Sequence, residues 1–178
     1  ALEGYLFPDT YEIYSNEPAR SIINRMLYRF GEVLTDELAA RAAERGMSVD
    51  ELITLASVIE KEAKIEADFK RVSAVFHLRL ERDMKLQSDA TLKYIFKTGE
   101  GITFNEEQRN NPSLYNTYAN GGLPLGPICN PGMRAIRAVL EPDARTTEQG
   151  YLYFCLSDDE AGSLVYAKTL EEHTANVE

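Results

Sequence analysis

The sequence contains few residues that could bind a metal or react as thiols. In 178 residues there is no tryptophan, and there are only two histidines and two cysteines. His77 and His173 have no second ligand at metal-binding spacing, and the spacing of Cys129 and Cys155 matches no zinc pattern. The cysteines could form one disulfide or remain two buried thiols. We therefore expect no metal site.

The chain also lacks a long apolar run and an excess of basic residues. No apolar run approaches the roughly 18 residues that span a bilayer, and there is no signal-peptide pattern at Ala1. Lys and Arg number 19 against 29 Asp and Glu, so the formal net charge is −10. Because nucleic acids and anionic membranes are bound by clustered Lys and Arg, we expect no nucleic acid among the partners. A neutral or amphoteric polymer remains an acceptable partner.

The remaining composition is that of an ordinary globular domain. Hydrophobic residues make up 44% and charged residues 27%, which excludes a disordered or collagen-like chain. The length fits a single domain over residues 1–178. Since the start at Ala1 has no initiator Met and leads at once into an aromatic segment, we expect a fragment of a longer protein.

The stretch from Ser48 to Ala63 is predicted to be a buried helix at the centre of the fold. Ser48 followed three residues later by Glu51 has the form of a capping box, which specifies a helix start. Apolar residues at helical spacing cover one face and both of its borders: Leu52, Ile53, Leu55, Ala56, Val58, Ile59 and Ala63. A helix with so wide an apolar face must be largely covered.

Two carboxylates lie near the end of this helix. Glu60 leaves it at the border of the apolar face, where lost hydration should raise its pKa toward the range that suits a general acid. The pattern equally allows an ordinary salt bridge from Glu60 to Lys64 one turn on. Glu62 lies on the opposite border, about 200° around the helix from Glu60, so the two cannot share one site. Periodicity alone does not choose between them.

The other segments predict an α+β fold that is mostly helical. Helices are expected from a cap at Ser15 or Asn16 to Gly31, with Pro18 in the first turn, at 35–46 and 67–82, after Ser88, after Asn130 and after Thr169. Strands are expected at 151–156 and 163–167 with a turn at 158–162. In the helix at 67–82, the pattern places Arg71, Arg79 and Arg82 outside. Residues 115–132 are too rich in Gly and Pro for either element, which predicts a long, ordered and functional loop.

Five short motifs are spread over nearly the whole chain. In order they are Leu2–Tyr11, Leu55–Glu62, Leu86–Asp89, Tyr115–Tyr118 and Gly122–Pro124. Together they resemble the endolytic murein transglycosylases, the MltG or YceG-like family. That family consists of bacterial envelope enzymes with an N-terminal membrane anchor and a small LysM-like domain ahead of the catalytic part, and this chain looks like the catalytic part alone.

The resemblance implies an activity, a location and partners. The activity is endolytic cleavage of the β-1,4 bond between N-acetylmuramic acid and N-acetylglucosamine, which leaves 1,6-anhydro-muramyl ends without a cofactor. The location is the extracytoplasmic face of the bacterial cell membrane, held by a single N-terminal transmembrane anchor of the full-length protein. The partners are peptidoglycan glycan strands and, as candidates, peptidoglycan synthases of the elongation or division machinery.

The resemblance also places the catalytic acid at Glu60, on a helix similar to the acid-bearing helix of lysozyme. Glu60 would protonate the glycosidic oxygen and then, as a base, deprotonate the muramic C6 hydroxyl that attacks C1. A second carboxylate is not required, unlike in a two-carboxylate glycosidase. The side chains expected around the sugar are Gln87, Ser88, Asp89, Tyr115, Asn116 and Tyr118. For the two tyrosines, core packing is the alternative role, and for Asp89 it is a plain helix start.

Two other functions stay open. A muramidase would hydrolyse the same bond, with Asp89 or Glu62 positioning a water molecule. A glycan-binding module without activity would hold a strand for a synthase. A pyridoxal phosphate lyase is disfavoured because the sequence offers no phosphate cradle with a paired lysine.

Overall fold

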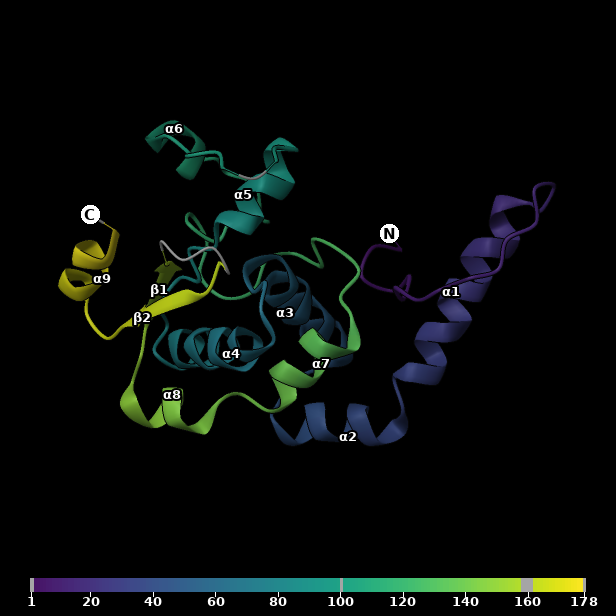
Figure 1. Cartoon of the computed structure of the whole chain (residues 1–178), viewed down its shortest axis with the longest axis horizontal. Coiled ribbons are helices and arrows are strands. Elements are labelled where there is room, and N and C mark those ends of the chain that lie inside the picture. Colours follow the sequence, from purple (N-terminus) through teal and green to yellow (C-terminus); the bar gives the residue numbers. More distant parts are fainter. Residues whose placement is uncertain (1, 100, 158–161, 178) are drawn as a thin grey trace.

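Helix α3 (Val49–Glu62) lies at the centre of the computed structural model, which describes residues 2–99, 101–157 and 162–177 (Figure 1). It packs against α2, α4, α5 and α7, and every residue from Leu52 to Ile59 is buried. Both halves of its capping box form: Glu51 N donates to Ser48 Oγ at 3.2 Å, and Ser48 N donates to Glu51 Oε2 at 2.8 Å. The predicted central helix and its start are confirmed.

Most of the other helices of the body lie where the sequence predicts them. They are α2 (Asp36–Glu44), α4 (Glu66–Glu81), α5 (Asp89–Phe96), α6 (Glu106–Arg109), α7 (Met133–Leu140) and α8 (Ala144–Gln149). Helices α6 and α8 were not predicted; each begins with a side-chain cap, from Asn105 and Asp143. Helix α7 begins later than expected, because the Asn130 side chain accepts hydrogen bonds from Gly4 N and Leu6 N instead of capping it.

The C-terminal part supplies the predicted β structure. Strands β1 (Tyr153–Leu156) and β2 (Leu164–Ala167) pair antiparallel, with Tyr153 opposite Ala167, and α9 (Leu170–Val177) packs on this hairpin. Asp68 of α4 is 1% exposed and accepts hydrogen bonds from Leu164 N at 3.1 Å and Tyr166 Oη at 2.9 Å. The carboxylate therefore fixes β2 to the helical body. Residues 158–161 of the predicted turn lie outside the described residues.

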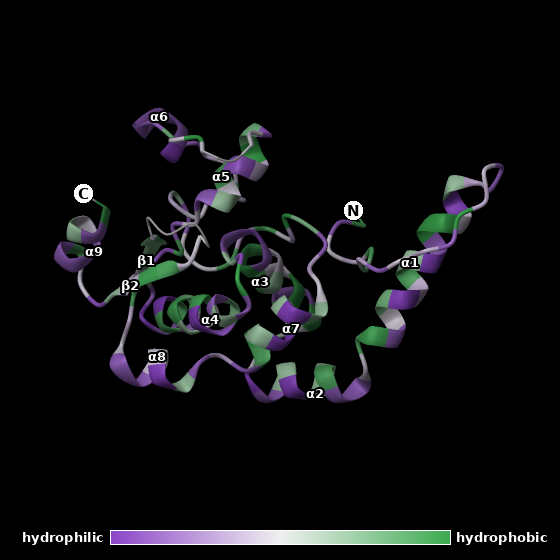
Figure 2. Cartoon of the chain, viewed as in Figure 1, coloured by the Kyte–Doolittle hydropathy of each residue, from purple (hydrophilic) through white to green (hydrophobic). Residues whose placement is uncertain are grey.

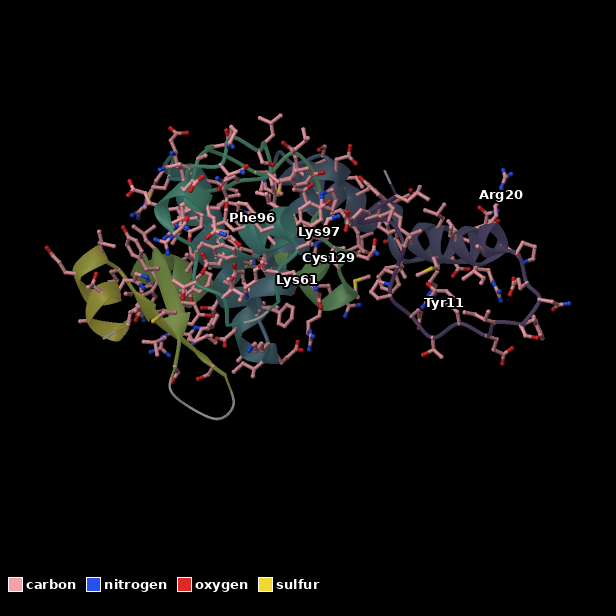
Figure 3. All side chains as sticks on the ribbon, turned by 90° about the horizontal axis from the view of Figure 1, so that it is seen from above. Tyr11, Arg20, Lys61, Phe96, Lys97 and Cys129 are labelled. Carbon is pink, nitrogen blue, oxygen red and sulfur yellow. The ribbon has the colours of Figure 1, made fainter. Side chains whose placement is uncertain are left out.

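Helix α1 (Ala19–Val33) projects from the body as an arm (Figure 1). Figure 3 shows that Arg20 on this helix and Tyr11 on the segment before it lie far from Lys61 and Cys129. None of the residues of α1 is buried, and hydrophobic and hydrophilic residues alternate along it (Figure 2). An ion pair from Arg29 Nε to Asp9 Oδ2 at 2.7 Å ties it to the preceding extended segment. Within the described part of the chain, no helix is both long and apolar enough to span a membrane.

The predicted loop at 115–132 contains no helix or strand and packs against the N-terminal motif. Gly4 has a φ of +93°, and a Cβ there would lie 2.5 Å from Pro127 Cγ. Only glycine tolerates both the left-handed backbone and this approach. Gly4 N also donates to Asn130 Oδ1 at 2.7 Å. The N-terminal motif and this loop, which are far apart in the sequence, are therefore held side by side next to α3.

Candidate active site

Glu62 is the last residue of α3, and its side chain reaches the start of α5. Its Oε1 accepts a hydrogen bond from the Ser88 hydroxyl and another from Ala90 N at 3.3 Å. Ala90 N belongs to the first turn of α5, where free backbone N–H groups favour a negative charge. The carboxylate thus has donors that stabilise its ionised form.

Burial nevertheless raises the pKa of Glu62, since removal from water penalises the charged carboxylate more than its neighbours favour it. The hydrogen bonds from Ser88 and Ala90 lower the pKa, as does the charge of Lys93, whereas the charge of Asp89 raises it. A carboxyl that holds its proton closer to neutral pH can act as a general acid and then as a base. The sequence predicted this property for Glu60.

Glu60 lies on another side of the same helix end and has a different neighbour. Its Oε2 accepts a hydrogen bond from Gly132 N at 3.1 Å, at the start of α7. Gly132 has no side chain with which to cap α7, so the Glu60 carboxylate satisfies one of the free N–H groups there. The two carboxylates therefore lie in separate environments, as their positions on the helix predict.

Ser88, Asp89 and Tyr118 are brought together beside Glu62. Ser88 is 3% exposed and makes no side-chain cap to α5, because its hydroxyl donates to Glu62 instead. Asp89 Oδ1 accepts a hydrogen bond from Tyr118 Oη at 2.5 Å. Burial and the Asp89 carboxylate raise the pKa of Tyr118, so this hydroxyl stays a donor. Three predicted site residues therefore surround a carboxylate other than the one expected.

Gln87 holds a strained backbone next to this cluster. Its φ is +49°, a conformation that costs a residue other than glycine about 1–2 kcal/mol. Its backbone N–H donates to Thr117 O at 3.1 Å, and its side chain is exposed. Strained residues of this kind occur often at functional sites, so the position agrees with the predicted site segment.

Asn116 does not face the site. It is 0% exposed, and its Nδ2 donates to Arg109 O at 2.9 Å and Asn111 O at 2.8 Å, while its Oδ1 accepts from Tyr118 N at 2.9 Å. Both donors and the acceptor of the side chain are engaged with backbone. The direct sugar contact expected from the sequence does not fit this geometry, and Asn116 instead braces the loop that carries Tyr118.

Tyr115 packs against Tyr94 and the hydrophobic core. Its ring lies 4.9 Å from that of Tyr94, centroid to centroid, and it packs against the hydrophobic core. Tyr94 in turn donates from its hydroxyl to Glu3 Oε2 at 2.7 Å. This arrangement matches the alternative of core packing that the sequence left open for Tyr115.

Arg79 is the residue beside the site that the sequence pattern misplaced. It was expected outside, but it is only 6% exposed. Its Nε donates to Leu152 O at 2.7 Å, and its Nη1 donates to Leu86 O at 2.8 Å and Lys85 O at 3.1 Å. Its burial could have been predicted from its place in the last turn of a helix before a tight connection, where a basic side chain can reach free carbonyls.

Cys129 and Cys155 are not joined to each other, so the disulfide that the sequence allowed does not form. Cys129 Sγ donates to Ser57 O at 3.3 Å, and burial raises the pKa of Cys129 to about 11. Among residues 2–99, 101–157 and 162–177, no group of three His, Cys, Asp or Glu side chains is arranged to hold a metal ion.

Two surface hollows lie away from the predicted site residues. One of about 520 Å³ lies on α1 around Leu27 and Tyr28, and one of about 660 Å³ lies on α9 around Leu170 and Thr174. Neither is lined by a predicted site residue.

Comparison with known proteins gives consistent matches over the whole chain. The model of the YceG-like family matches residues 1–178. The chain is 36% identical over 173 residues to the endolytic murein transglycosylase of Bacillus subtilis strain 168, covering 97% of this chain and 46% of the relative. It is 37% identical over 180 residues to the enzyme of that name from Streptococcus pneumoniae serotype 2 strain D39, covering 99% and 32%.

A solved structure extends the match to the fold. The 2.6 Å crystal structure of a YceG-like protein from Listeria monocytogenes superposes with a TM-score of 0.85 at 36% identity, over 98% of this chain and 55% of that one. The α+β fold expected from the sequence is confirmed by this match. The chain spans less than half the length of the two curated relatives above.

Proposed function

The chain belongs to the YceG-like family, and we propose that it carries the catalytic centre of an endolytic peptidoglycan transglycosylase in which Glu62 is the acid and base. Relatives named endolytic murein transglycosylase support the reaction. The observation that carries the choice of acid is the contact of the half-buried Glu62 side chain with Ser88, next to Asp89 and Tyr118.

The proposed reaction needs one carboxyl in two protonation states. Protonated Glu62 donates its proton to the glycosidic oxygen as the bond from that oxygen to C1 of the muramic acid breaks, and the N-acetylglucosamine end leaves as an alcohol. The ionised Glu62 then takes the proton of the C6 hydroxyl, whose oxygen attacks C1 and closes the 1,6-anhydro ring. The hydrogen bonds from Ser88 and Ala90 N stabilise the carboxylate between these two steps.

Asp89 contributes charge to this reaction. Its carboxylate raises the pKa of Glu62 and would stabilise the positive charge that develops at C1. The hydroxyl of Tyr118 holds it in place at 2.5 Å. Asp89 therefore supports the acid without acting as a nucleophile.

Glu60, the acid expected from the sequence, has surroundings that suit a structural role. Its contact with Gly132 N caps α7, whereas the hydroxyls and the second carboxylate gather at Glu62. Its catalytic role stays an untested prediction that the geometry does not favour.

A glycan substrate also agrees with the proposed extracytoplasmic location, and the membrane anchor and synthase partners stay predictions.

Mass spectrometry of purified peptidoglycan strands digested with this protein tests the proposal. The unmutated protein should release internal fragments with anhydro ends, and Glu62→Gln should release none. Glu60→Gln is the matched control, because a glutamine at that position keeps the oxygen that accepts from Gly132 N, so activity should be largely kept.

Three results would contradict the proposal. Activity that survives in Glu62→Gln and disappears in Glu60→Gln would return the acid to Glu60. Reducing ends instead of anhydro ends would indicate the muramidase. Binding of strands without any cleavage by the unmutated protein would favour the glycan-binding module.

A further inference from the structure

The guanidinium of Arg79 is buried at the end of α4, beside the connection that leads to α5. Its Nη1 donates to the carbonyl oxygens of Lys85 and Leu86 and, at 3.4 Å, to Gln87 Oε1. Its Nε donates to Leu152 O at the edge of the hairpin. Burying a charge is costly unless hydrogen bonds replace its water, and here they come mainly from the carbonyls of one short segment.

The same segment is held from its other side by Thr117. Gln87 N donates to Thr117 O at 3.1 Å, and Ser88 N donates to Thr117 Oγ1 at 3.0 Å. Between these two sets of contacts, Gln87 adopts its left-handed backbone. A strained residue of this kind persists only where the surroundings determine it. Arg79 and Thr117 together thus impose the turn that precedes Ser88.

This turn decides where the Ser88 hydroxyl points. A serine at the N-cap position ordinarily turns its oxygen toward the N–H groups of its own helix, but Ser88 makes no such cap and donates to Glu62 instead. We propose that Arg79 is a positioning residue of the active site, which holds residues 85–87 so that the Ser88 hydroxyl reaches Glu62. The inference rests on the proposed role of Glu62.

The hydrogen bond from Ser88 supplies a readout of this positioning. It lowers the pKa of Glu62 against the effect of burial, so displacing Ser88 should raise that pKa further. The charged groups that also face Glu62 are Asp89 and Lys93, with the Tyr118 hydroxyl nearby. Because the positive charge of Arg79 could itself affect Glu62, the variant must keep that charge.

The test is Arg79→Lys, which keeps the charge but cannot reproduce the fork of the guanidinium. Carbon-13 NMR of labelled glutamate carboxyls, assigned with Glu62→Gln, measures the pKa of Glu62 in the free protein. We expect that pKa to rise in Arg79→Lys and in Ser88→Ala, and not in Arg82→Lys, the same change at an exposed arginine in the next turn of the chain.

Kinetics on glycan strands should show the same coupling. A misplacement of about 1 Å in an active site can cost about 100-fold in rate, so kcat should fall at least about tenfold in Arg79→Lys with KM nearly unchanged. The alkaline limb of the pH profile should move upward. In the Ser88→Ala background, Arg79→Lys should cost little more, because its effect is already lost.

Additive losses in that cycle, or an unchanged Glu62 pKa in a folded Arg79→Lys protein, would overturn the inference. If Arg79→Lys does not fold, Arg79→Gln replaces it, since the Ser88→Ala background corrects for the lost charge. Activity retained by Glu62→Gln would refute the proposed function instead, and the NMR measurement, which needs no substrate, would still test Arg79.

Discussion

Glu62→Gln should stabilise the folded protein at high pH and leave its stability nearly unchanged at low pH. The pKa of Glu62 is raised in the fold above its ordinary value of 4.5, chiefly by burial, so the folded state binds this proton more tightly than the unfolded state does. Stability is therefore lost as pH rises from the unfolded pKa through the folded pKa, and the loss is complete above it. Glutamine does not titrate and avoids this loss.

The magnitude follows from linkage. A one-unit difference in pKa corresponds to about 1.4 kcal/mol, and 1 kcal/mol shifts the Tm of a domain of this size by about 2–4 °C. Each unit by which the fold raises the pKa should then separate the Tm values of the two proteins by about 3–6 °C above the folded pKa. Glutamine can still accept hydrogen bonds from the Ser88 hydroxyl and Ala90 N. The change in stability that does not depend on pH should therefore be small.

Thermal unfolding of both proteins between about pH 4 and about pH 8 measures this difference. The quantity of interest is the change in the Tm gap across the range, since any packing difference cancels. Glu60→Gln serves as the control for exchanging a carboxylate for an amide at the end of α3. A Tm gap for Glu62→Gln that stays constant over the whole range would refute the assignment of a raised pKa to this group.

Two further substitutions test the parts of the fold that support the site. Gly4→Ala should lower the free energy of unfolding by about 2 kcal/mol or more, because a Cβ would lie 2.5 Å from Pro127 Cγ on a backbone with φ +93°. A Tm equal to that of the unmutated protein would contradict this packing. Asn116→Ala should lower the free energy of unfolding by about 1–3 kcal/mol for each backbone group left unpaired, measured by denaturant unfolding. It should also lower activity in strand digestion, because Asn116 holds Tyr118. Full activity with normal stability would show that the loop does not need these hydrogen bonds.

Most of the helical fold could be predicted because local patterns determine it. The capping box at Ser48 and the apolar spacing of α3 act within one or two turns, so the sequence predicts the centre of the core directly. The start of α7 was predicted too early, because Asn130 is used by the N-terminal segment, a contact between residues 126 positions apart. Local rules hold until a distant partner competes for the same side chain.

The burial of Arg79 shows that a local pattern can also misplace a charged side chain. Helical periodicity placed it outside with Arg71 and Arg82, and only Arg79 among these three is buried. Charged residues are seldom buried, so the expectation was reasonable, but α4 ends at Glu81 and its last turn faces a connection with free carbonyls. The end of a helix needs to be examined for acceptors, separately from its faces.

The choice between Glu60 and Glu62 depended on contacts that no local pattern contains. Each carboxylate meets the start of a helix whose N-cap residue does not cap it: Gly132, which has no side chain, and Ser88, whose hydroxyl points elsewhere. These contacts join residues 72 and 26 positions apart. At Gly132 the helix start offers only a backbone N–H, so Glu60 can do little there but cap. At Ser88 it brings a hydroxyl, a second carboxylate and a tyrosine, which are the groups that an acid needs around it.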